Sequence, residues 1–109
     1  MRTLIMTHDF EEFYDSLPLN VQDKVDVALQ ILSERKIIST KFVKKLVSTE
    51  FYELRVSVGN EYRVIMFAID HDNIIEAEQV ILLNGFLKKS TKDYQKAVRK
   101  AQKILDEQF

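Results

Sequence analysis

Apolar residues recur along this chain at two different spacings, which predict where helices and strands lie. At positions 10, 13, 14 and 17, and again between positions 21 and 32, apolar side chains fall three or four residues apart. We therefore expect helices over residues 9–17 and from residue 20 to about residue 36, joined near Pro18 as a helical hairpin. Either Thr7 or Asp9 can cap the first helix. A third helical stripe follows Ser90, which is its expected N-cap with Asp93 at capping-box distance.

Other segments alternate or are continuously apolar, as strands do. Residues 2–6 form a short apolar run, and residues 51–58 alternate with Glu53, Arg55 and Ser57 on one face. Residues 62–69 are almost wholly apolar, which is typical of a strand buried on both faces. Residues 74–83 predict a third strand, ended by residues 84–85, after which residues 86–89 leave the sheet. Residues 37–49 are less regular and are expected to be part loop and part edge strand.

The elements therefore follow the order β-α-α-β-β-β-α within a single domain over residues 1–109. This order predicts a small α+β fold, with a helix hairpin and a C-terminal helix around a mainly antiparallel twisted sheet. No apolar run reaches the eighteen residues of a membrane span, and the N-terminus turns acidic too early for a secretory signal. We accordingly expect a cytoplasmic protein without membrane contact.

The composition of the chain limits which kinds of functional site it can form. The chain has no cysteine and two isolated histidines, and the acidic pairs within residues 70–78 lack a third ligand, so we expect neither a metal nor a cofactor. The net charge is −1, yet lysine and arginine are absent from residues 64–85 and gather on both sides of that segment. One face of the protein can therefore be basic although the net charge of the chain is not, but ordinary solvated lysines would give the same pattern.

Two arginines lie on otherwise apolar strands. The hairpin turn at Gly59 and Asn60 makes Arg55 and Arg63 direct or diagonal neighbours, and two such cations repel unless an anion lies between them. A salt bridge to a nearby glutamate, 53 or 61, is one interpretation. A bound phosphate is the other, since guanidinium groups match phosphate oxygens.

Further residues could complete an anion site. Lys88 and Lys89, just after the third strand, could reach the same groove, and Tyr94 could stack on a base or simply pack in the core. The two glycines are too few for a phosphate-binding loop, and no Ser-His-Asp arrangement is evident.

The motifs YELR, YRV and GFLKKS, in this order and followed by an Ala-containing basic helix, resemble the RelE/ParE toxin superfamily. The resemblance is greatest to its HigB-type, phage-related branch. It implies a RelE-like fold and a toxin of a type II toxin–antitoxin system. Such a toxin is an mRNA endoribonuclease that works in the ribosomal A site without metal, by attack of the ribose 2′-hydroxyl on the adjacent phosphate. A helix-turn-helix antitoxin is its implied partner, docking on the groove, the acidic hairpin or the helix pair.

The resemblance also implies roles for individual residues. Arg63 would stabilise the phosphorane, and Arg55 would grip the scissile or an adjacent phosphate. Lys88 or Lys89 would be a general acid or a phosphate clamp, and Tyr94 would stack on or activate the nucleotide. Ribosomal or messenger RNA would be contacted by Lys41, Lys44, Lys45 and Lys92.

This chain departs from the family pattern in its slightly acidic charge and in lacking a histidine near the C-terminal helix, so no general base is apparent. The alternative function is non-enzymatic: a ParE-like topoisomerase inhibitor, or an inactive prophage remnant that only binds its antitoxin.

Overall fold

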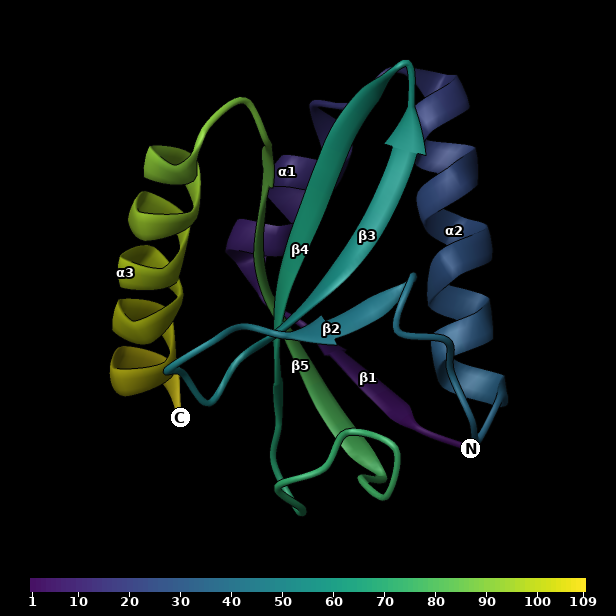
Figure 1. The fold of residues 1–109 in the computed structure, drawn as a ribbon, viewed down its shortest axis with the longest axis vertical. Helices are drawn as coiled ribbons and strands as arrows, with labels where there is room; N and C mark the ends of the chain where they lie inside the picture. Colours follow the sequence, from purple (N-terminus) through teal and green to yellow (C-terminus); the bar gives the residue numbers. More distant parts are fainter.

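The computed structural model describes residues 1–109 and shows three helices packed on the two faces of one five-stranded sheet (Figure 1). Helices α1 and α2 cover one face, and α3 covers the other. No helix combines the length and the apolar character that crossing a bilayer requires. The elements are β1 (Thr3–Met6), α1 (His8–Asp15), α2 (Leu19–Glu34), β2 (Val43–Lys45), β3 (Tyr52–Val58), β4 (Asn60–Ala68), β5 (Gln79–Leu87) and α3 (Thr91–Gln108).

The strands lie in the order β1-β5-β4-β3-β2. β1 is parallel to β5, and the other neighbouring strands are antiparallel. The predicted α+β class and mainly antiparallel sheet are confirmed. The short β2 is the edge strand expected within residues 37–49, and it carries Lys44 and Lys45 at the rim of the sheet. Charged side chains on an edge oppose pairing with another chain.

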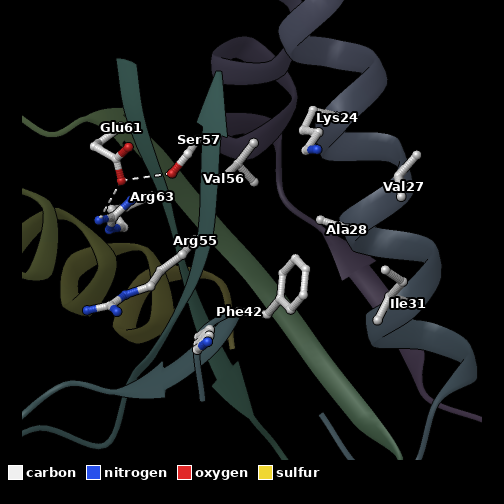
Figure 2. Close-up of a pocket in the computed structure, with 11 residues that line it drawn as sticks. Lys24, Val27, Ala28, Ile31, Phe42, Arg55, Val56, Ser57, Glu61 and Arg63 are labelled. Atoms are coloured by element: carbon white, nitrogen blue, oxygen red, sulfur yellow. Dashed lines mark hydrogen bonds and ion pairs between the residues drawn. The ribbon is translucent and has the colours of Figure 1, made fainter. Parts of the chain in front are cut away.

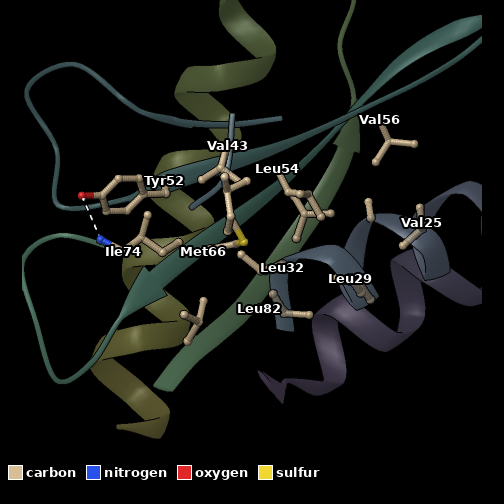
Figure 3. Close-up of a cluster of buried hydrophobic side chains, with 14 of the residues drawn as sticks. Val25, Leu29, Leu32, Val43, Tyr52, Leu54, Val56, Met66, Ile74 and Leu82 are labelled. Atoms are coloured by element: carbon tan, nitrogen blue, oxygen red, sulfur yellow. Dashed lines mark hydrogen bonds between the residues drawn. The ribbon is translucent and has the colours of Figure 1, made fainter. Parts of the chain in front are cut away.

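Alternation along the strands divides the apolar side chains between two cores. Leu54, Val64 and Leu82 belong to the larger core under α1 and α2, part of which Figure 3 shows. Ile65 and Leu83 point to the opposite face, in the smaller core under α3. Burying one such side chain contributes roughly 1.5–3 kcal/mol. The alternation therefore holds a helix layer on each face of the sheet.

Side-chain caps begin two of the helices. Thr7, rather than Asp9, caps α1, because its hydroxyl accepts a hydrogen bond from the Phe10 amide at 3.2 Å. At α3 the predicted capping box is present. The Asp93 carboxylate accepts from the Ser90 amide at 2.8 Å, and the Ser90 side chain accepts from the Asp93 amide in return. The direction of the chain into α3 is thereby set by local sequence.

The third strand of the meander begins and ends later than its pattern predicted. Residues 74–77 form a turn, and β5 continues through Asn84 and Gly85, which we expected to end the strand. The Asn84 side chain instead donates to the Ala97 carbonyl of α3 at 3.1 Å. A Cβ at Gly85 would lie 2.3 Å from ring carbons of Phe13 on α1, so only glycine fits there. Both residues serve packing between the sheet and the helices.

The turn before β5 explains why residues 74–77 resemble a strand. Ile74 and Ala77 are buried against the larger core, so their apolar character reflects burial in a turn. The Asp70 carboxylate accepts from the backbone amides of Glu78 and Gln79, each at 3.0 Å. These two hydrogen bonds fix the point at which β5 begins.

A buried arginine ties the turn before β5 to the end of α2. Arg2, in the segment leading into β1, is 4% exposed, and its guanidinium donates hydrogen bonds to five backbone carbonyls. Burial lowers the pKa of Arg2, and the nearby Glu76 carboxylate opposes that shift. The acceptors belong to Leu32, Arg35, Lys36, Ile74 and Ile75. Arg2 therefore satisfies carbonyls left unpaired where α2 ends.

Candidate functional site

Arg55 and Arg63 are paired directly across β3 and β4. The hairpin between them turns at Gly59, whose φ of +70° is the left-handed conformation expected there. Side chains directly opposite on one sheet face have Cβ atoms about 4.5–5.5 Å apart. Two guanidinium groups at this spacing repel each other, so their pairing requires a nearby negative charge.

Glu53 supplies that charge from the same face of β3. Its carboxylate is 1% exposed, with Oε1 2.8 Å from Arg55 Nε and Oε2 3.8 Å from Arg63 Nε. The salt bridge considered as one interpretation of the arginine pair is thus present. Of the two carboxylate oxygens, Oε2 receives no hydrogen bond.

Arg63 is enclosed and fully engaged. It is 4% exposed, and its three nitrogens donate to Tyr94 Oη at 3.0 Å, the Tyr62 carbonyl at 2.9 Å and Glu61 Oε1 at 3.2 Å. Burial alone would lower the pKa of Arg63, but the Tyr94 hydrogen bond and the glutamates raise it overall. Arg63 is therefore a fixed positive charge within the protein.

Arg55 is the accessible member of the pair. Its side chain is 33% exposed, and only Nε is hydrogen-bonded, to Glu53. The two terminal nitrogens have no acceptor in the protein. A planar guanidinium with both terminal nitrogens open can bind two oxygens of one phosphate. Burial thus distinguishes an arginine that is open to a ligand from one that is enclosed, a difference that spacing in the sequence did not show.

Tyr94 lies in the first turn of α3. The sequence left open whether it packs in the core or faces a ligand, and its ring and its hydroxyl differ in this respect. Its ring packs edge-on against Phe86, with centroids 5.3 Å apart, while its hydroxyl accepts from Arg63. Burial raises the pKa of Tyr94, and interaction with the Glu53 carboxylate raises it further against the opposing effect of Arg63. The hydroxyl therefore remains protonated at neutral pH.

The two lysines after β5 occupy different places. Lys88 Nζ lies 5.8 Å from the centre of the Tyr94 ring, and the Lys88 amide donates to the Glu61 carbonyl at 2.8 Å. Lys89 is exposed, and its amide joins the capping box through Asp93 Oδ2 at 2.7 Å. The structure thus brings Lys88 into the cluster around Tyr94, and it places Lys89 at the start of α3.

The four lysines expected to contact RNA are all exposed but do not form one patch. Lys44 pairs with Glu53 across β2 and β3 and so shares the face of the arginines, whereas Lys45 pairs with Tyr52 and points to the other face. Lys41 lies in the loop before β2, and Lys92 lies in the first turn of α3. Only Lys41 and Lys44 are placed to extend the charge of Arg55.

An open groove of about 520 Å³ lies beside the arginine pair (Figure 2). Lys24, Val27 and Ile31 of α2 line one wall, and Phe42 and Val56 line the other. Arg55 and Glu61 lie along its rim, where hydrogen bonds from Ser57 and Arg63 lower the pKa of Glu61. The groove combines apolar walls with a rim that carries both signs of charge.

Sequence reasoning treated Glu53 only as a salt-bridge partner and missed it as a part of the site. The signal was present, because strand alternation places Glu53 on the face of Arg55, and an acidic residue inside a strand needs partners there. No three histidine, aspartate or glutamate side chains come together as a metal site would require. The polar cluster on this face consists of Arg55, Arg63, Glu53, Tyr94 and Lys88.

Comparison with solved structures finds the same fold in RelE toxins. The chain matches RelE of the E. coli RelBE toxin–antitoxin complex with a TM-score of 0.63 and 16% identity, over 83% of this chain and all of that one. The isolated E. coli RelE toxin gives 0.59 and 17%, over 92% and 98% of the two chains. The RelB–RelE complex of Methanococcus jannaschii gives 0.57 and 17%, over 83% and 96%. At this low sequence identity, the structural similarity shows a shared fold and no more.

A comparison with curated protein sequences found no significant match. The family of phage-derived Gp49-like proteins, however, matches residues 12–106, which is most of the chain. This match, together with the RelE fold, confirms the resemblance to the RelE/ParE superfamily and to its phage-related members. The chain belongs to the family of phage-derived Gp49-like proteins and has the fold of the RelE toxins.

Proposed function

We propose that this protein is the toxin of a toxin–antitoxin pair and acts as a ribosome-dependent, metal-independent endoribonuclease on mRNA. The observation that carries the proposal is the pairing of Arg55 directly opposite Arg63. The buried Glu53 carboxylate lies between the two guanidinium groups. Arg55 is accessible, and Arg63 donates a hydrogen bond to the Tyr94 hydroxyl. A surface that only docks a partner does not require like charges paired at the cost of burying a carboxylate.

In the proposed reaction the 2′-oxygen of one nucleotide attacks the adjacent phosphorus, and the bond from phosphorus to the 5′-oxygen breaks. The phosphoryl oxygens gain negative charge in the transition state, and fixed cations stabilise that charge. Arg55 is assigned to these oxygens because its terminal nitrogens are unbonded. Arg63, a buried positive charge beside Arg55, stabilises the same negative charge without contacting the phosphate, and it holds the Tyr94 hydroxyl in place.

The lysines supply the remaining contacts. Lys88, beside the Tyr94 ring, is assigned as the second phosphate ligand and as the proton donor to the leaving 5′-oxygen. Lys89 and Lys92 add positive charge where α3 begins, and Lys41 and Lys44 do so along the edge of the sheet. Exposed lysines of this kind bind RNA backbone by releasing counterions.

An antitoxin is the proposed protein partner, because two of the similar structures are complexes of RelE with RelB. The groove beside Arg55 is the proposed docking place. Val27 and Phe42 are exposed apolar side chains at its walls, at 53% and 40%, and Lys24 and Lys41 are available to an acidic segment. An occupant of the groove would cover Arg55 and so exclude RNA. The helix-turn-helix class implied by the family resemblance remains our expectation for the rest of the antitoxin.

Induction of wild type, Arg55→Gln and the control Arg99→Gln in bacteria tests the function. Arg99 is exposed on α3 and makes no ion pair with an acidic side chain. We expect wild type and the control to arrest growth and to create new mRNA 5′ ends within codons. The Arg55 variant should lose cleavage by roughly 10²–10³-fold, as when one transition-state donor is removed. Growth arrest with unchanged mRNA ends would instead favour a ParE-like topoisomerase inhibitor.

A further inference from the structure

The Glu53 carboxylate contains an unused proton acceptor. Glu53 is 1% exposed, and its Oε1 is occupied by Arg55, whereas Oε2 receives no hydrogen bond. Leaving a buried acceptor unpaired costs about 1–3 kcal/mol. Such a group is uncommon in native proteins and calls for an explanation in each case, a catalytic role being one.

The Tyr94 hydroxyl carries a hydrogen that it can direct to the Glu53 carboxylate. Its oxygen accepts from Arg63 Nε at 3.0 Å, which leaves its own hydrogen free to point elsewhere. The same Arg63 nitrogen lies 3.8 Å from Glu53 Oε2, so the hydroxyl and the free carboxylate oxygen flank one N–H group. Burial of Tyr94 and interaction with Glu53 both raise the pKa of the hydroxyl. The two groups are therefore electrostatically coupled.

We propose that Glu53 acts through Tyr94 as the proton acceptor of RNA cleavage, an inference that rests on the proposed ribonuclease function. As the 2′-oxygen attacks phosphorus, its proton passes to Tyr94 Oη, while the proton of Tyr94 passes to Glu53 Oε2. The bond from phosphorus to the 5′-oxygen breaks, and that oxygen takes a proton from the Lys88 ammonium. Glu53 gains one proton and Lys88 loses one, and exchange with water restores both. This relay supplies the general base that the sequence left unassigned.

The other carboxylate near the arginines is less suited to this role. Glu61 accepts from Ser57 at 2.9 Å and from Arg63 at 3.2 Å through the same oxygen, and its side chain is 49% exposed. These hydrogen bonds lower its pKa, which weakens it as a base. Glu53, by contrast, has one carboxylate oxygen that receives no hydrogen bond.

A double-mutant cycle separates this role from a purely structural one. Glu53→Gln and Tyr94→Phe keep the size of each side chain, and Glu107→Gln on the exposed face of α3 is the control. Single-turnover cleavage of ribosome-bound mRNA is measured for each variant and for the double variant. We expect each single change to slow cleavage by roughly 10²–10⁴-fold, the usual value of general base catalysis. The double variant should be no more than about 3-fold slower than the slower single variant, since both changes break one relay.

Two results of this cycle would overturn different statements. If the losses multiply in the double variant while wild type is active, Glu53 does not work through Tyr94. If wild type leaves ribosome-bound mRNA intact, the ribonuclease function itself is wrong. Binding of an RNA with a 2′-methoxy group at the cleavage position should be unchanged in Tyr94→Phe, because this change keeps the ring and leaves the Arg55–Glu53 ion pair in place.

A second measurement needs no activity. Ultraviolet titration of tyrosine, compared between proteins with and without Tyr94→Phe, isolates the ionisation of Tyr94. Glu53→Gln should move this titration to lower pH, because the carboxylate raises the pKa of the hydroxyl. An unchanged midpoint would overturn the inference. If Glu53→Gln fails to fold, Glu53→Asp keeps the charge but withdraws the oxygen, and it should lower kcat with KM unchanged.

Discussion

Arg55 and Arg63 are direct cross-strand partners, yet they differ in what they offer to a ligand. Arg63 is 4% exposed with every nitrogen bonded, whereas the Arg55 side chain is 33% exposed with two nitrogens open. The difference arises because α3 brings Tyr94 over Arg63 and leaves the β2 side of Arg55 uncovered. Substitutions at the two positions should therefore have different effects on stability and on activity.

Replacing Arg63 with alanine should destabilise the fold as well as the site. It would leave Glu53 buried with only Arg55 as its partner and would remove the hydrogen bond to Tyr94. Breaking a buried ion pair by removing one partner costs about 3–5 kcal/mol. Urea unfolding should show this loss for Arg63→Ala and a smaller one for Arg55→Ala. Equal losses would contradict the unequal burial of the two arginines.

Gly85→Ala should destabilise the protein through one contact. The added Cβ would lie 2.3 Å from ring carbons of Phe13, and overpacking of this kind costs about 1–3 kcal/mol. Thermal unfolding measures the effect. The matched control is Gly59→Asn, because Gly59 has no atom within 4 Å of its Cβ position and asparagine tolerates positive φ. Phe13→Leu should restore part of the stability of Gly85→Ala, and no restoration would place the strain elsewhere.

The capping box of α3 should make stability depend on acid pH. Hydrogen bonds from the amides of Lys89 and Ser90 lower the pKa of Asp93 below its ordinary value of 3.8. Because the folded pKa is the lower one, this contribution is fully present well above pH 3.8 and is lost as pH falls through that value to the folded pKa. The difference in unfolding free energy between wild type and Asp93→Asn should accordingly shrink below pH 3.8. Parallel curves in urea titrations across this range would contradict the assignment.

Lys44 should contribute to RNA affinity in a salt-dependent way. It is exposed on the face of the arginine pair, so it is placed to contact one phosphate. Each phosphate contact with single-stranded RNA changes the slope of log affinity against log salt concentration by about 0.7. Filter binding of a 2′-methoxy RNA should show a slope smaller by that amount for Lys44→Ala. Lys45→Ala, on the opposite face, should leave the slope unchanged, and equal effects would exclude a one-sided RNA path.

Local sequence was sufficient for the elements whose signals are local. The capping residues Ser90 and Asp93, the turn at Gly59 and the alternation of β3 each depend on neighbours a few residues away, and all were predicted correctly. The position of β5 was not, because Gly85 is required by Phe13 on α1 rather than by a turn. The local sequence does not distinguish a glycine that is required by a distant contact from a glycine that ends a strand.

The same division applies to the candidate site. The sequence by itself determined that Arg55 and Arg63 would be neighbours on one face of a hairpin, since alternation and the turn leave little choice. Only the tertiary structure decided which arginine is buried, that Glu53 lies between them with one free oxygen, and that Lys89 stands apart from Lys88. These properties depend on where α3 packs. That packing is set by apolar contacts between residues far apart in the chain, which strand and helix periodicities do not specify.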